Sequence, residues 1–102
     1  MNKINVILKR AGSSPKPISI ENDLSDMEEI VEGPIAVLRL GQDICLICNL
    51  FEHQLVMNKN IRIDENIIHG NIFFVRAFQG GFASLNVNDF SFVTSVLNRG
   101  TI

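Results

Sequence analysis

The alternation of apolar and polar residues predicts short strands along the first half of the chain. Residues 4–9 (INVILK) alternate in part and are rich in β-branched side chains, which is typical of a strand. Residues 16–21 (KPISIE) follow a turn rich in Gly, Ser and Pro and predict a second strand, where Pro17 suits the first residue or a sheet edge. Residues 35–40 and 44–49 are apolar runs separated by a short turn at 41–43, and they predict a central β-hairpin.

Residues 22–33 (NDLSDMEEIVEG) predict a helix, because their apolar side chains form one stripe at helical spacing. The stripe consists of Leu24, Met27, Ile30 and Val31. Asn22 is expected to cap the N-terminus of this helix. Gly33 is expected to take the left-handed position at its C-terminus, and Pro34 blocks further helix.

The second half of the chain predicts one strong strand and a second helix. The strand runs from about Gly70 to Phe78, with one weaker strand before it, and a Gly80-Gly81 turn leads into FASL. In the helix that follows, Asn86 is a good N-cap and Asp89 stands where a capping box needs it. The expected inward face is Phe90, Val93, Val96 and Leu97, with Leu85 packing on Phe90 and Gly100 ending the helix.

The resulting order is β-β-α-β-β-(β)-β-α without an internal repeat, which predicts an α+β fold. We expect a small antiparallel or mixed sheet with two helices packed against one of its faces. The 102 residues suit a single domain spanning 1–102, and 46% hydrophobic residues suit a folded globule rather than a disordered chain.

Charge and composition narrow the class of protein. A net charge of -2 gives no broad attraction to nucleic acid. Lys3, Lys9 and Arg10 interrupt the N-terminal apolar residues, so no secretory signal is expected, and no apolar run approaches the ~20 residues of a membrane span. We therefore expect a soluble protein of the cytoplasm. Trp and Tyr are absent, so any base-stacking surface has to use one of the seven Phe or a His.

Cys45 and Cys48 form a C-x-x-C motif, but they fall within a strand-like run. Residues three apart in a strand face opposite sides, with Cα atoms ~10 Å apart, whereas a disulfide needs them within roughly 7 Å. The histidines, His53 and His69, are spaced too widely for a zinc-finger pattern. We therefore expect two free, buried thiols, no metal and no cofactor.

Other candidate chemistry has a simpler structural interpretation. His53 is expected in a turn and His69 before a strand, with solvated or structural roles, and no G-x-S-x-G elbow is present to pair with a histidine. Glu28, Glu29 and Glu32 fall on the polar side of the first helix, which favours a solvated face over acid–base chemistry. The Gly80-Gly81 pair matches no phosphate loop, although glycine there lets a ligand approach the backbone closely.

Three asparagines interrupt the apolar pattern at residues 49, 58 and 60. Asn49 ends a buried strand, and Asn58 and Asn60 flank Lys59. Each is either a turn or cap residue, or part of a polar site at one end of the sheet. If residues 55–58 run back antiparallel beside the strand that ends at Asn49, then Asn49 and Asn58 are neighbours.

Several short motifs recur in one known group of proteins. IVEGPIAVLRL, ICLICN, LVMN, IIHGNIFFV and FASLN, spread over residues 30–97, together resemble a family of small uncharacterised proteins carried by phages and conjugative elements. The matching positions are Val31, Gly33, Asn49, Leu55, Asn58, Ile68, Gly70, Ser84 and Leu85. Leu50-Phe51-Glu52 replaces the usual Glu-x-Gly, and Val56 stands where the family has Pro.

The resemblance implies an accessory protein of a mobile element, without established enzymatic activity, that acts in a bacterial host cell. Interference with host defence fits such a protein, either by sequestering a nucleotide immune signal or by binding a defence protein. Our first hypothesis is a non-enzymatic homo-oligomer with a pocket for a nucleotide-like signal. Its ligand-binding residues are Arg39 and Arg76 for phosphate, Asn49 and Asn58 for amide contacts, and Phe51 or Phe82 for stacking.

The rival hypothesis is a protein–protein module that docks on a host protein through an exposed sheet edge or a Phe-rich patch. An enzyme that uses His69 as a base ranks behind both.

Overall fold

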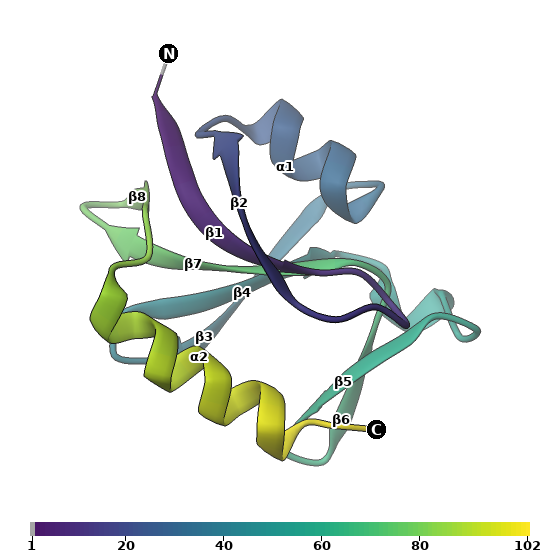
Figure 1. Cartoon of the computed structure of the whole chain (residues 1–102). Coiled ribbons are helices and arrows are strands. Elements are labelled where there is room, and N and C mark those ends of the chain that lie inside the picture. The colour runs from purple at the N-terminus through teal and green to yellow at the C-terminus, as the bar shows by residue number, and fades with distance from the viewer. Residues whose placement is uncertain (1) are drawn as a thin grey trace.

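An antiparallel sheet runs through the middle of the molecule, with one helix on each side (Figure 1). The computed structural model describes residues 2–102. The elements are β1 (Lys3–Lys9), β2 (Lys16–Glu21), α1 (Leu24–Val31), β3 (Ile35–Gly41), β4 (Ile44–Asn49), the 3₁₀ turn η1 (Glu52–Gln54), β5 (Lys59–Ile63), β6 (Asn66–His69), β7 (Ile72–Phe78), β8 (Gly81–Ala83) and α2 (Val87–Arg99).

The main sheet has the strand order β2-β1-β7-β4-β3, and β8 pairs with the far end of β7. The strands β5 and β6 form a separate two-stranded sheet. Every strand pair is antiparallel. The predicted α+β fold, with an antiparallel sheet and two helices packed on it, is confirmed, and the single weak strand expected before β7 is instead a hairpin of two.

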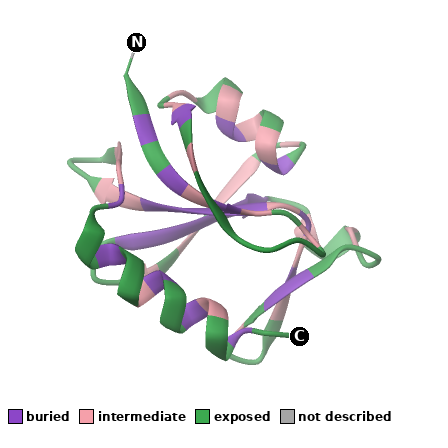
Figure 2. Ribbon diagram, in the orientation of Figure 1, coloured by how far each residue is buried: buried purple, intermediate pink, exposed green. Residues whose placement is uncertain are grey.

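The two helices cover opposite faces of the sheet, so the expectation that they share one face is wrong (Figures 1 and 2). Cys45 and Ile47 of β4 pack in the core beneath α1, whereas Leu46 and Cys48 pack in a second core with α2 and the β5–β6 hairpin. Every residue of β4 is buried, which is why its sequence is an unbroken apolar run instead of an alternating one.

Helix α1 begins and ends one residue away from the predicted caps. Asp23, not Asn22, is the N-cap, and its carboxylate accepts a hydrogen bond from the Asp26 amide. Glu32, not Gly33, has the left-handed conformation at the C-terminus, with φ of 64°. A left-handed backbone is therefore not the reason for glycine at position 33.

Helix α2 has the predicted N-terminus. The Asn86 side chain accepts hydrogen bonds from the amides of Asn88 and Asp89, and the Asp89 carboxylate accepts one from the Asn86 amide, which completes a capping box. The expectation that Phe90 lies on the inward face is wrong, because Phe90 is 40% exposed. The buried position of the first turn belongs to Asp89, and Phe92 is the phenylalanine that packs against the core.

We expect Asn86→Ala to lower the free energy of unfolding by ~1 kcal/mol, because it leaves the two amides of the first turn without their acceptor. Phe90→Ala should cost less than Phe92→Ala, which reverses the order expected if Phe90 were inward. Chemical denaturation monitored by circular dichroism measures all three variants. A larger loss for Phe90→Ala than for Phe92→Ala would contradict the observed orientation of α2.

Two residues of β5, Asn60 and Arg62, form hydrogen bonds with elements outside the β5–β6 hairpin. The Asn60 amide donates to the carbonyls of Lys9 and Gly70, while its oxygen accepts a hydrogen bond from the Lys9 ammonium at 2.6 Å. The Arg62 amide donates to the carbonyl of Gly100, the C-cap of α2. A Cβ on Gly100 would lie 2.5 Å from the Arg62 carbonyl oxygen, so glycine allows this close approach.

Within residues 2–102, neither helix is long and apolar enough to cross a membrane.

Candidate functional site

An open pocket lies on the α1 face of the sheet, beyond the part that α1 covers. It has a volume of about 620 Å³ and is lined by residues of β3, β4, β7, β8 and the turns that join them. The lining is Val37, Arg39, Asp43, Cys45, Ala77, Phe78, Gln79, Gly80, Gly81 and Phe82. Two of the six predicted ligand-binding residues, Arg39 and Phe82, therefore line one cavity although they are far apart in the sequence.

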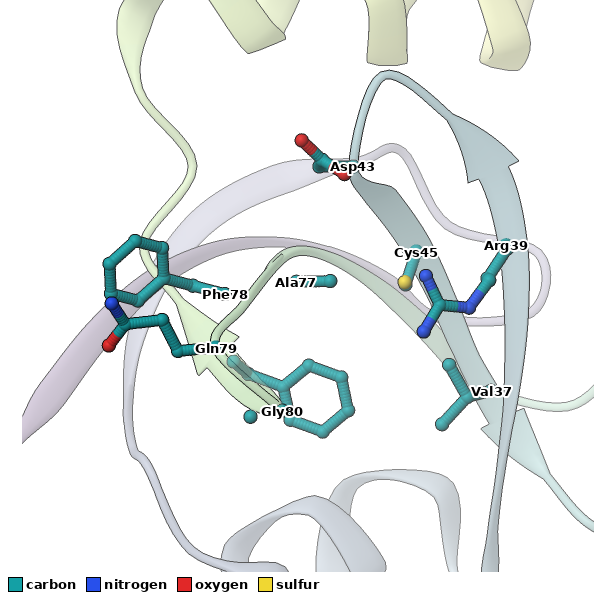
Figure 3. Close-up of a pocket in the computed structure, with 10 residues that line it drawn as sticks. Val37, Arg39, Asp43, Cys45, Ala77, Phe78, Gln79 and Gly80 are labelled. Carbon is teal, nitrogen blue, oxygen red and sulfur yellow. The ribbon is translucent and has the colours of Figure 1, made fainter.

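The register of the strands explains how Arg39 reaches this pocket. Arg39 is paired with Cys45, and Cys45 is paired with Val75 on β7, so these residues form a row across the sheet. Figure 3 shows the guanidinium of Arg39 extending over β4 toward Cys45, with Phe78 and Gln79 on the opposite side of the pocket. Arg39 makes no ion pair within residues 2–102, so its charge faces the open pocket.

The floor of the pocket is not a reactive thiol. Burial raises the pKa of the Cys45 thiol, and the nearby Arg39 only partly opposes this effect. On the other face of β4, burial raises the pKa of Cys48 to about 11, and Glu52 adds to the shift. Both cysteines are free and buried, on opposite sides of the strand as expected, and both are protonated at neutral pH.

The turn that joins β7 to β8 forms the other wall of the pocket. Gln79 and Gly80 have φ of 49° and 78°, a left-handed pair that closes the two-residue turn between Phe78 and Gly81. Gly80 has open space where a Cβ would stand. The backbone of this turn is therefore accessible to a ligand, as the Gly80-Gly81 pair suggested.

Asn49 lies outside this pocket and has a structural role. It is 7% exposed, and its side-chain amide donates to the carbonyls of Val31 at 3.0 Å and Glu32 at 3.3 Å. Its side-chain oxygen accepts a hydrogen bond from the Phe51 amide. Asn49 thus joins the C-terminus of α1 to the turn after β4, and its polar atoms are occupied by the protein itself.

Gly33 is required by the Asn49 side chain. A Cβ at position 33 would lie 2.7 Å from the amide nitrogen of Asn49, which is too close for any side chain.

We expect Gly33→Ala to destabilise the protein by about 1–3 kcal/mol through this overlap. In an Asn49→Ala background the same substitution should cost far less, because the overlapping amide is gone.

A double-mutant cycle by chemical denaturation measures this coupling between residues 33 and 49. Equal costs of Gly33→Ala in both backgrounds would show that the overlap is not what requires glycine.

Asn58 is not held beside Asn49 in the expected way. Residues 55–58 form a turn, and β5, which follows them, pairs with β6 and not with β4, so the expected antiparallel return beside β4 is wrong. Asn58 is exposed, and its backbone bonds connect it to Leu55 and Gly70. Phe51 is half exposed at the start of η1. Neither Asn58 nor Phe51 lines the pocket of Arg39 and Phe82.

Arg76 is on the opposite face of the sheet and is already paired. Its guanidinium donates two hydrogen bonds to the carboxylate of Asp89, and Asp43 lies 3.9 Å away. The expectation that Arg76 contributes charge to a phosphate site is not supported by this geometry, because Asp89 already occupies the Nε–Nη2 edge of the guanidinium.

His69, like Arg76, is bonded to a carboxylate of the protein itself. Its Nδ1 lies 2.9 Å from the carboxylate of Glu52, which also accepts a hydrogen bond from the His69 amide at 2.7 Å. Glu52 thus ties η1 to β6. Among residues 2–102, no group of three His, Cys, Asp or Glu side chains is arranged to hold a metal ion.

Comparison with known proteins places the chain in a family. No curated protein matches the sequence. No solved structure matches the fold. Residues 4–97 match the family described as "Domain of unknown function (DUF3846)", which covers the sheet and nearly all of α2. Because the match spans most of the 102 residues, the chain belongs to the DUF3846 family.

Proposed function

We propose that this protein is a non-enzymatic binding protein that holds a small anionic, nucleotide-like signal in the pocket of Arg39 and Phe82. The observation that carries the proposal is the meeting in one cavity of an aromatic side chain, an accessible glycine turn and a guanidinium that forms no ion pair within the described residues 2–102. Its volume of about 620 Å³ is in the ordinary range for small-molecule sites.

Each wall of the pocket has a role in binding such a ligand. Arg39 binds a phosphate through paired, charge-assisted hydrogen bonds, which are about twice as strong as neutral ones. Phe82, half-buried on β8, offers a ring for stacking on a base. The turn at Gln79 and Gly80 offers backbone polar groups, and Asp43 on the rim accepts hydrogen bonds from base or sugar donors.

Binding without a chemical step agrees with the state of the nearby reactive groups. The Cys45 thiol in the pocket floor is held protonated by burial. His69 is bonded to Glu52 and is not part of the pocket lining. Sequestration of the ligand is therefore the proposed activity.

The finer proposal is that the protein is an accessory of a phage or conjugative element, acting as a homo-oligomer against host defence in the bacterial cytoplasm. The family-like motifs support this origin, and the open mouth of the pocket leaves room for a second subunit to close over the ligand. Native mass spectrometry of protein purified from a defence-active host measures the subunit number and any bound small molecule together.

Direct binding tests the pocket itself. Isothermal titration calorimetry with adenine and guanine mononucleotides, cyclic mononucleotides and cyclic dinucleotides as probes should identify at least one that binds. Arg39→Ala should then weaken binding of that probe by about tenfold or more, because a charge-assisted contact is lost. Phe82→Leu, which keeps an apolar side chain in the core, should also weaken it.

Matched controls separate site effects from general ones. Arg10→Ala removes the same charge from an exposed position outside the pocket, and Asn58→Ala removes an exposed amide. Both should bind like the parent protein. If no probe binds, or if Arg39→Ala and Arg10→Ala have equal effects, the proposed pocket function is wrong.

A second candidate function, docking on a partner protein, is favoured by one observation. The strand β3 is the last in its sheet, and within residues 2–102 only β4 pairs with it. An exposed sheet edge is a common site for recognition of an extended peptide.

A further inference from the structure

A second groove lies on the α2 face, beside the free edge of β3. It has a volume of about 500 Å³ and is bounded by β3, by the end of β5 and by one side of α2. Its apolar walls include Leu38, Leu40 and Phe92, which are all half-buried at the margin of the core. This groove is separate from the pocket on the α1 face, although Arg39 touches both.

The groove is positively charged in a protein whose net charge is negative. Arg39, Arg62 and Arg99 line it, against one carboxylate, Asp64. None of the three arginines forms an ion pair within the part of the chain that the structure describes. Three unpaired guanidinium groups around an apolar trough complement a partner that brings both carboxylates and apolar side chains.

The strand edge adds a backbone requirement to this charge. A strand that lies beside β3 satisfies the outward N–H and C=O groups of that edge, and its side chains alternate between the two faces of the sheet. Side chains on one face meet the groove with Arg62 and Arg99, and those on the other face meet Arg39, which packs on the α1 side. A segment with carboxylates on both sides and an apolar residue over Leu40 and Phe92 matches all of these groups.

We propose that the edge of β3 and its groove bind an extended acidic and apolar segment of a partner protein, which adds to the sheet as a further antiparallel or parallel strand. Backbone pairing with β3 supplies affinity, and Arg62 and Arg99 select for acidic side chains. This site shares Arg39 with the proposed nucleotide pocket, whereas Arg62 and Arg99 line the groove alone.

The test uses a fluorescent, end-capped peptide as long as β3, seven residues, in which pairs of glutamates alternate with pairs of valines, so that each face of the strand carries both carboxylates and an apolar side chain. Fluorescence anisotropy should show saturable binding that weakens as salt is added. A peptide with lysine in place of glutamate should not bind, and neither should the glutamate peptide methylated on all of its backbone nitrogens, which removes the donors of both strand edges. The double variant Arg62→Glu with Arg99→Glu should bind about tenfold or more weakly.

The matched control is Lys3→Glu with Arg10→Glu, which reverses two exposed charges away from the groove and should bind like the parent. Thermal melts of both double variants verify folding, which is needed because Arg99 also bonds the Ser95 carbonyl at the end of α2. Nucleotide binding by the Arg62/Arg99 variant should be unchanged, so failure of this proposal is distinct from failure of the pocket.

Equal binding of the lysine peptide, or of the N-methylated peptide, overturns the proposal. So does a shift to dimers in analytical ultracentrifugation that the Arg62/Arg99 variant abolishes while the peptide remains unbound, since the groove then belongs to a second copy of this chain. Binding of single-stranded DNA in place of the peptide overturns it as well.

Discussion

Asn49→Asp is expected to destabilise the protein by about 3 kcal/mol or more, although it changes only one atom of the side chain. In the parent protein the amide nitrogen donates to the carbonyls of Val31 and Glu32. The substitution places a carboxylate oxygen against these two carbonyl oxygens in a buried position, where no donor replaces the lost amide. The C-terminus of α1 should therefore separate from the sheet.

Chemical denaturation at pH 7 measures this loss, and Asn58→Asp is the matched control at an exposed site. The control should change the free energy of unfolding by no more than ~0.5 kcal/mol. If Asn49→Asp is as stable as the control, the amide is not what holds α1. The comparison also tests whether the asparagine that ends β4 and the one that precedes β5 are structural: we expect a large effect on stability at residue 49 and almost none at residue 58.

Asp89→Ala is expected to cost about 2–3 kcal/mol, because one carboxylate serves two purposes. It caps the N-terminus of α2 through the Asn86 amide and holds Arg76 of β7, thereby joining helix to sheet. Asp43→Asn is the control: Asp43 also lies near Arg76, but its side chain is 73% exposed, and asparagine tolerates the left-handed φ of 62° at this position, so the change should cost little. Similar losses for both variants would contradict the central role of Asp89.

The same carboxylate gives the stability of the protein an acid dependence. Hydrogen bonding from Arg76 lowers the pKa of Asp89, while burial opposes the shift. A folded-state pKa below the unfolded value of about 3.9 means that the stabilisation is fully present above that value. It is lost as the pH falls through the folded pKa. The stability gap between parent and Asp89→Ala should be constant from about pH 7 to pH 5 and shrink as the pH falls below about 3.9.

The strands were predictable because their signals are local. The turn residues at 41–43 indicate a hairpin, and Asn86 with Asp89 indicates the start of α2. Each signal lies within a few residues of the element that it predicts. The face of the sheet that each helix covers was harder to predict, because it depends on the order of the strands in the sheet. The buried pattern of β4 on both faces did contain this information, since an unbroken apolar run needs cover on two sides.

The site residues were harder to predict. A polar residue type alone does not distinguish a side chain that contacts a ligand from one that holds two segments of the protein together. Arg39 and Arg76 are both strand arginines, but their strands present them to opposite faces, and only Arg76 meets a carboxylate. Asn60, for which the sequence leaves open a turn or cap residue and a polar site, is buried and makes three hydrogen bonds within the protein. The sequence predicts the turn between β7 and β8. Its place in a pocket depends on the pairing of β8 with β7, which the local sequence does not indicate.

The central position of β7 affects how the chain folds while it is being synthesised on the ribosome. β7 lies between β1 and β4, yet it is synthesised after both. Until Phe78 has emerged, the β1–β2 and β3–β4 hairpins each expose an apolar edge with no strand to pair with. Such edges are the surfaces through which incomplete chains associate. Fragments that stop before residue 72 should therefore aggregate or require a chaperone, and protection of the β4 amides from hydrogen exchange should appear only with chains that include all of β7.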